Sequence, residues 1–119
     1  WVPAVGQGSI AIEAHSSLDP SIRAQITSKL NDAHTATEVI AERAFLEKFE
    51  GGCSIPVFAH ATSDQNGIIL MGGIISLDGK QKILKKRSSY DPKDLGICLA
   101  LEVLEAGGQN ILKEIREQI

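Results

Sequence analysis

Two turn dipeptides in the second half of the chain constrain its fold more than any other feature. Asn66-Gly67 and Asp78-Gly79 belong to the dipeptide types that favour tight turns between antiparallel strands. They separate three strand-like runs, at about residues 56–63, 68–77 and 81–88. The sequence therefore predicts a three-stranded antiparallel meander.

Proline, glycine and basic residues occupy informative positions in the predicted strands. Pro56 begins the first strand, where a missing N–H does least harm, and Gly72-Gly73 indicates a bulge or a close approach in the second. The basic residues of the third run could attract a carboxylate-rich ligand. Because lysines also protect an outer strand from pairing with another chain, we favour the edge-strand interpretation. These residues are Lys80, Lys82, Lys85, Lys86 and Arg87.

Two helices are predicted before the sheet. Asp19-Pro20 supplies an N-cap and a first-turn proline, and apolar residues recur every fourth position from Ile22 to Leu30. We therefore expect a helix over about 20–31. Thr35 and Glu38 resemble a capping box that opens a second helix, which ends near Phe49. Apolar positions extend almost all the way round this second helix, so we expect it to be buried on two sides.

Arg43 lies among the apolar positions of the second helix. An unpaired charge in such surroundings would be unfavourable. We therefore expect a partner for Arg43, either Glu47 one turn later or an anionic group of a ligand. The salt bridge is the favoured alternative, because arginine stems often pack against apolar residues with a paired head.

The C-terminal region predicts two further helical segments. Asp91-Pro92 repeats the combination of cap and proline, and the apolar stripe that follows is interrupted at Gly107-Gly108. A short helix with Ile111, Ile115 and Ile119 in register completes the chain. Cys98 belongs to the apolar stripe, so we expect it to have a structural role.

The first 31 residues differ from the rest of the chain. Residues 8–14 alternate as a strand does, with Ile10 and Ile12 on one face, but no hairpin partner is visible. With the helix at 20–31, they would form a strand and a helix without visible partners, so we expect a seam near residues 31–33 that sets 1–31 apart from the rest. Residues 32–119 are expected to form an α+β unit that closes its own core. Because Trp1 stands where a methionine would begin a complete chain, we expect a longer protein upstream.

Composition narrows the class of protein. The 119 residues are 43% hydrophobic and carry a net charge of -3, which favours a globular domain over a general nucleic-acid or membrane binder. Apolar runs are broken well before about 18 residues, and no signal peptide is visible, so a cytoplasmic location is expected. Two cysteines and three isolated histidines argue against a disulfide framework or a metal site.

Cys53 is the strongest candidate for chemistry. It follows Gly51-Gly52, and two glycines leave space at the sulfur for a bulky group to approach. Alternatively, Gly51 ends the preceding helix and Cys53 packs as a small buried apolar residue, which composition alone favours. The residues by themselves leave both interpretations open.

Three stretches carry a resemblance to a known family. They are Pro3-Ala-Val-Gly-Gln-Gly8 with Ile12-Glu13, Ala41-Glu-Arg-Ala-Phe-Leu46, and Glu50-Gly-Gly-Cys-Ser-Ile-Pro-Val57. In order and spacing, the chain resembles the C-terminal part of the porphobilinogen deaminase (hydroxymethylbilane synthase) family over nearly its whole length. That resemblance implies a last domain made of a three-stranded antiparallel sheet backed by helices.

The resemblance also implies a function. Members of the family are transferases that condense four porphobilinogen units into hydroxymethylbilane, with release of ammonia. Cys53 matches the cysteine that holds a dipyrromethane cofactor through a thioether, and Gln7 matches a glutamine near the substrate cleft. Residues 1–4 would complete the second domain and 5–31 would belong to the first. The catalytic aspartate lies in those earlier domains, so this chain alone is expected to be inactive.

Two positions depart from the family pattern. His15 stands where an arginine is common, and His34 precedes Thr35 where an acidic residue is usual. Neither change touches the cysteine loop.

The alternative to the transferase function is a stand-alone α+β module that binds a ligand or a protein without covalent chemistry. A purely structural helix-and-sheet dimer unit also stays open as an interpretation. In the preferred interpretation the partners are porphobilinogen, the growing pyrrole chain and the missing N-terminal domains.

Overall fold

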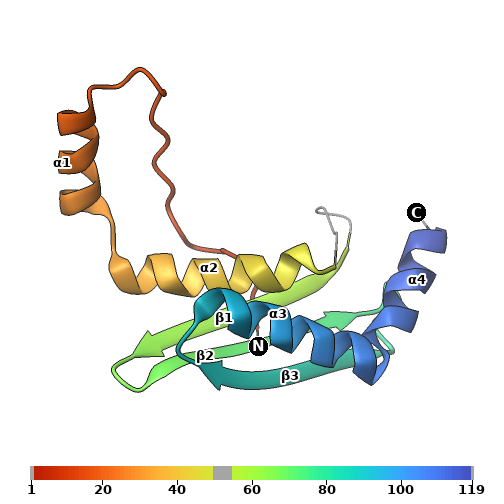
Figure 1. Cartoon of the computed structure of the whole chain (residues 1–119). Helices are drawn as coiled ribbons and strands as arrows, with labels where there is room; N and C mark the ends of the chain where they lie inside the picture. Colours follow the sequence, from red (N-terminus) through yellow and green to blue (C-terminus); the bar gives the residue numbers. More distant parts are fainter. Residues whose placement is uncertain (1, 50–54, 119) are drawn as a thin grey trace.

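The computed structural model describes residues 2–49 and 55–118. Two helices come first, then three strands, then a helical C-terminal region (Figure 1). The elements are α1 (Pro20–Leu30), α2 (Ala33–Glu47), β1 (Val57–Asp64), β2 (Gly67–Ile75), β3 (Lys82–Ser89), α3 (Pro92–Val103), a π-helical turn η1 (Leu104–Gly108) and α4 (Gln109–Gln118).

The strands form the predicted antiparallel meander, in the order β1-β2-β3. Asp64 lies opposite Gly67 at the first turn, and Ile75 lies opposite Lys82 at the second. Gly67 and Gly79 both have positive φ, at 121° and 75°, which explains the glycine in each turn dipeptide. β3 is an edge strand, which confirms the position inferred from its lysines.

One face of the sheet is covered by α2 and α3, which lie side by side (Figure 1). Alternate residues of β1 and β2 point into this layer, while those between them face away from it. Helices α2, α3 and α4 supply the other half of the core. Its largest fully buried side chains are Phe45, Phe49, Leu70, Ile74, Leu95, Leu99, Val103 and Ile115.

Glycines allow the layers to approach closely. A Cβ built on Gly72 of β2 would lie 2.9 Å from Cζ of Phe45, so the ring sits directly over bare backbone. This confirms the close approach expected at Gly72-Gly73. A Cβ on Gly96 of α3 would collide with the carbonyl oxygen of Ala41 and lie 2.6 Å from Cβ of Ala44. The contact between α2 and α3 therefore requires glycine at position 96.

The C-terminal helices bend where the sequence predicted an interruption. Gly107 has a φ of 117° inside the π-helical turn between α3 and α4. Pro92–Gln118 is long and apolar enough to cross a membrane by length and composition, but 44% of its most apolar window is buried against the rest of the fold. Packing on the sheet thus accounts for part of its apolar character.

The N-terminal region corrects one prediction. Helix α1 forms as expected, and Asp19 caps it by accepting a hydrogen bond from the Ser21 N–H. The strand predicted at about 8–14 does not form: residues 9–15 are in no strand, and Ile10 is 92% exposed. The alternating pattern suits a strand, but a strand also needs a neighbour, and no described segment pairs with these residues. This part of the chain projects away from the sheet (Figure 1).

Two expectations for α2 were also wrong. The helix begins at Ala33 and is capped by Asp32, whose carboxylate accepts hydrogen bonds from the N–H groups of His34 and Thr35. Glu38, expected in a capping box, instead reaches across to β1. The helix is buried on one side only, because Ile40 and Arg43 lie on a surface that no described element covers.

We expect Gly96→Ala to lower the free energy of unfolding by about 1–3 kcal/mol, because the added methyl group overpacks the α2–α3 contact. Urea denaturation of this variant and of Lys93→Ala would test this. Lys93 is exposed on the same helix, so its replacement should change stability by less than about 0.5 kcal/mol. An increase in stability for Gly96→Ala, as helix propensity alone would give, would contradict the close packing.

Asp78 organises the turn between β2 and β3. Its carboxylate accepts hydrogen bonds from the Ser76 hydroxyl at 2.5 Å and from the Lys80 N–H at 2.9 Å. These bonds, the hydroxyl first, lower the pKa of Asp78 from its ordinary value of 3.8. Because the folded-state pKa lies below the unfolded value, the contribution to stability is present above about pH 3.8. It is lost as the pH falls through the folded-state pKa.

We therefore expect Ser76→Ala to raise the pKa of Asp78 back toward its ordinary value. An NMR titration of the side-chain carboxyl carbons measures this directly. The pKa of Asp19, lowered mainly by the Ser21 hydroxyl, serves as the internal control and should not move. Identical Asp78 titration curves for the wild type and Ser76→Ala would show that the Ser76 hydroxyl does not lower the pKa of Asp78.

Candidate functional site

The predicted cysteine lies outside the described residues, but both neighbouring elements are described. Residues 50–54, which include Gly51-Gly52-Cys53, connect the end of α2 to the start of β1. On the α2 side, the Phe49 ring is fully buried and lies 5.0 Å from the Phe45 ring. On the β1 side, the Pro56 carbonyl accepts a hydrogen bond from the Ile75 N–H, and Val57 is buried. The core thus anchors the chain on either side of the motif.

Arg116 of α4 makes a contact at the α2 end of this connection. Its Nη2 donates a hydrogen bond to the Phe49 carbonyl at 3.2 Å. The carbonyls of the last helical turn lack partners within the helix, and a cation near them is favourable. The last turn of α2 contains no basic residue of its own, and α4 supplies one from elsewhere in the chain.

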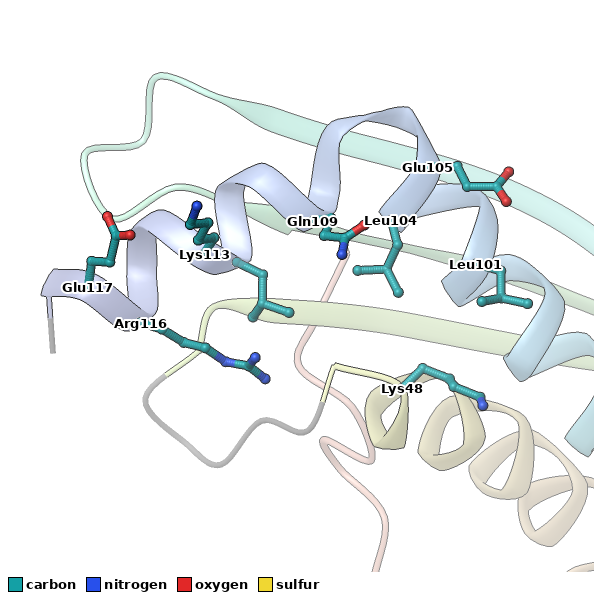
Figure 2. Close-up of a pocket in the computed structure, with 9 residues that line it drawn as sticks. Lys48, Leu101, Leu104, Glu105, Gln109, Lys113, Arg116 and Glu117 are labelled. Atoms are coloured by element: carbon teal, nitrogen blue, oxygen red, sulfur yellow. The ribbon is translucent and has the colours of Figure 1, made fainter.

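A groove of about 700 Å³ lies between the end of α2 and the α3–α4 bend (Figure 2). Leucines form its apolar part, including Leu101 and Leu104. Lys48, Lys113 and Arg116 contribute positive charge, and Glu105 and Glu117 contribute negative charge. In Figure 2, Arg116 extends from α4 toward the end of α2, where Lys48 lies.

Gln7, the second predicted site residue, lies in a compact turn. Its Oε1 accepts a hydrogen bond from the Ala4 N–H at 3.2 Å, and its own N–H donates to the Ala4 carbonyl. Gly6 and Gly8 on either side have φ values of 69° and 86°. The Gln7 side chain is exposed beside a hollow of about 390 Å³, which Glu42 and His60 also line.

Glu42 is a site residue that sequence reasoning missed. It is 6% exposed and joins the Gly6 turn to β1 through two backbone hydrogen bonds. One feature could have revealed it: a carboxylate between Ala41 and Phe45, on the side of α2 that carries core residues, requires polar partners. Only the tertiary structure identifies those partners.

Arg43 behaves differently from expectation. Its side chain is exposed, and it forms no salt bridge with Glu47 or with any other residue in the ranges 2–49 and 55–118. The apolar pattern of α2 predicts a buried position at Arg43, and a buried arginine would need a partner. Since that side of α2 is uncovered, Arg43 remains solvated and needs none within the described chain.

The histidines lie apart from one another. His60 Nδ1 is 3.8 Å from Glu42 Oε1, and His34 Nδ1 is 3.2 Å from the Ser63 hydroxyl. His15 contacts Ser17 in the projecting N-terminal region. Within the described parts of the chain, no three His, Cys, Asp or Glu side chains gather as metal ligands would. Cys98 is half-buried on α3 and has no disulfide partner among the described residues.

The chain is similar in sequence to proteins of one known family. Residues 36–105 match the family model described as porphobilinogen deaminase, C-terminal domain. A protein named porphobilinogen deaminase from Cytophaga hutchinsonii is 48% identical over 98% of this chain, and one from Desulfosudis oleivorans is 43% identical over 99%. The chain spans 38% and 39% of the lengths of these two relatives.

The fold and the matched region together define a class, an α+β domain in which helices cover one face of a three-stranded sheet. Within that class, the chain belongs to the porphobilinogen deaminase family. The match includes all of the sheet and the 50–54 connection. Residues 2–35 lie outside the matched domain, although the relatives cover them as well.

We expect Arg116→Ala to lower the free energy of unfolding by about 1 kcal/mol or more, because it removes a charged donor from the Phe49 carbonyl. Denaturant unfolding, with Lys113→Ala as a matched control, measures the difference. Lys113 lines the same groove, and its replacement should change stability by less than about 0.5 kcal/mol. Equal losses for the two variants would mean that the Phe49 bond contributes nothing specific.

Proposed function

We propose that this chain is the C-terminal, cofactor-carrying domain of a porphobilinogen deaminase. The whole enzyme would act in tetrapyrrole biosynthesis, condensing four porphobilinogen units into hydroxymethylbilane with release of ammonia. The observation that carries the proposal is the position of Cys53: a single thiol after two glycines, between two core-anchored elements, in a chain that belongs to this family.

The chemistry of a thiol fits the proposed attachment. Loss of ammonia from an aminomethylpyrrole leaves an electrophilic exocyclic carbon, and a sulfur nucleophile can form a C–S bond to that carbon. The resulting thioether is not readily hydrolysed, as a permanent anchor requires. When bound, the dipyrromethane supplies the pyrrole end from which the product chain grows. Cys53 would then act as an attachment point and would not be regenerated at each turnover.

The described residues support the attachment indirectly. Phe49, held by the core and by Arg116, and Val57, buried in β1, would limit how far the ends of the cysteine loop move. Gln7 would meet the substrate cleft from the side of the N-terminal segment. The catalytic aspartate is expected upstream, so the 119-residue chain alone would be inactive.

The N-terminal region supports a multidomain enzyme over a stand-alone binding module. Ile10, Ile12 and Leu30 are each at least 60% exposed, and α1 has no buried residue. Such apolar exposure is unfavourable in a complete domain and is expected of a surface that packs against another part of the protein. Upstream domains of the enzyme, which we place in the cytoplasm, would cover it.

The full-length enzyme should carry a dipyrromethane on Cys53. We expect intact-mass measurement to show an adduct on the wild type that is absent from Cys53→Ser, and a pyrrole colour reaction to follow the same pattern. Cys98→Ser is the matched control and should keep the adduct, because Cys98 lies on α3 in the apolar core stripe. Masses for wild type and Cys53→Ser that differ only by the substitution would refute the proposal.

The isolated 119-residue chain should contain an unmodified thiol at position 53, because cofactor assembly would need the upstream domains. The same mass measurement applies. A pyrrole adduct on the isolated chain would show instead that this domain assembles its own cofactor.

A further inference from the structure

Glu42 is the only charged side chain that is buried within residues 2–49 and 55–118, with 6% of its surface exposed. Burial of a carboxylate is costly unless its oxygens accept hydrogen bonds. Those bonds therefore indicate what the residue holds in place.

The two oxygens of Glu42 bind different parts of the chain. Oε2 accepts a hydrogen bond from the Gly6 N–H at 2.7 Å, and Oε1 accepts one from the Ala61 N–H at 2.9 Å. His60 Nδ1 lies 3.8 Å from Oε1 and is largely exposed. One side chain on α2 thus connects the N-terminal segment to strand β1.

The N-terminal segment is held on β1 by backbone contacts as well. The Ala59 N–H donates to the Pro3 carbonyl at 3.1 Å, and Ala4 forms an antiparallel bridge with Phe58. Val5 packs against the core. The turn that contains Gln7 begins directly after these contacts, and the Glu42 bond is made at its first glycine, Gly6.

Glu38 provides a comparison one turn earlier on the same helix. Its Oε1 accepts hydrogen bonds from the Ser63 N–H and hydroxyl, so it also links α2 to β1. No hydrogen bond joins Glu38 to the N-terminal segment in the described structure. Both glutamates therefore link α2 to β1, but only Glu42, the more deeply buried of the two, also bonds the N-terminal segment at Gly6.

We propose that Glu42 is a positioning residue, which fixes residues 2–8, and with them Gln7, against the domain that carries Cys53. This inference rests on the proposed function, in which Gln7 meets the substrate cleft and Cys53 holds the growing chain. A carboxylate suits the position because both facing groups are N–H donors. A glutamine amide has a single acceptor oxygen, so it can keep only one of these bonds. Because the Ala61 N–H belongs to the paired strand β1, we expect the amide to keep that bond and to turn its NH2 group toward Gly6, which loses its acceptor.

The test uses full-length enzyme with Glu42→Gln and the matched control Glu38→Gln. In Glu42→Gln we expect amide hydrogen exchange across residues 2–8 to become about tenfold faster, because a buried hydrogen bond to Gly6 is lost. We also expect kcat/KM to fall by about tenfold, mainly through KM, while amide exchange in β1 and β2 stays unchanged. Glu38→Gln should leave exchange across residues 2–8 unchanged and kcat/KM within about twofold.

Unchanged exchange across residues 2–8 in Glu42→Gln would overturn the inference, as would equal effects of the two variants. If Glu42→Gln does not fold, Glu42→Asp, which shortens the reach to Gly6 but keeps the carboxylate, takes its place with the same expectations. Intact mass separates this inference from the proposed function. A wild-type enzyme without a pyrrole adduct would refute the function, whereas loaded enzyme with unaltered exchange would refute the role of Glu42 alone.

Discussion

The packing of the Phe45 ring on Gly72, together with the close approach of α3 to α2 at Gly96, is the constraint on which the rest of the structure depends. The ring is fully buried between α2 and the middle strand, and only bare backbone on β2 leaves room for it. Gly96 brings α3 equally close to α2 on the other side. Because α2 lies close to the sheet and α3 lies close to α2, one face of a three-stranded sheet is enough to bury a continuous core.

This packing also determines what surrounds the cysteine motif. Phe49 follows Phe45 by one helical turn and is buried by the same core, so α2 reaches the motif in a fixed position. The helix α4 returns from the far end of the chain to bind the Phe49 carbonyl through Arg116. Residues that are 67 apart in sequence thereby meet at the start of the 50–54 connection. In the proposed enzyme, this anchoring would hold the two ends of the cofactor-carrying connection in place.

The N-terminal segment is attached to this domain at residues 2–8 and then leaves it. Glu42 and β1 hold its first part, while residues 9–30 contribute no buried side chain. The backbone of residues 2–8 is thus hydrogen-bonded to the domain, whereas Ile10 and Ile12 further along the segment are exposed to solvent. In the proposed enzyme, this segment would link the C-terminal domain to the domain that contains Ile10 and Ile12 and would limit their relative movement.

Local patterns were sufficient to predict the meander, α1 and the break at Gly107, because turn dipeptides, proline and glycine act through neighbouring backbone angles. The family and the candidate Cys53 were also evident from short motifs alone. The strand at 8–14 failed for a physical reason: alternation shows that a strand would suit the sequence, but its hydrogen bonds must come from a partner. Capping by Thr35 failed because Asp32, three residues earlier, is a stronger N-cap than threonine.

The sequence by itself determined the three-stranded meander, the helices α1 to α4 and their order, and the family, since these depend on residue type and on spacing of a few positions. Only the tertiary structure decided which side of α2 is covered, that Arg43 stays solvated, and that Glu42 binds Gly6 and Ala61. Those facts depend on contacts between residues 19 and 36 positions apart, and burial and hydrogen bonding at such separations are set by how the layers pack.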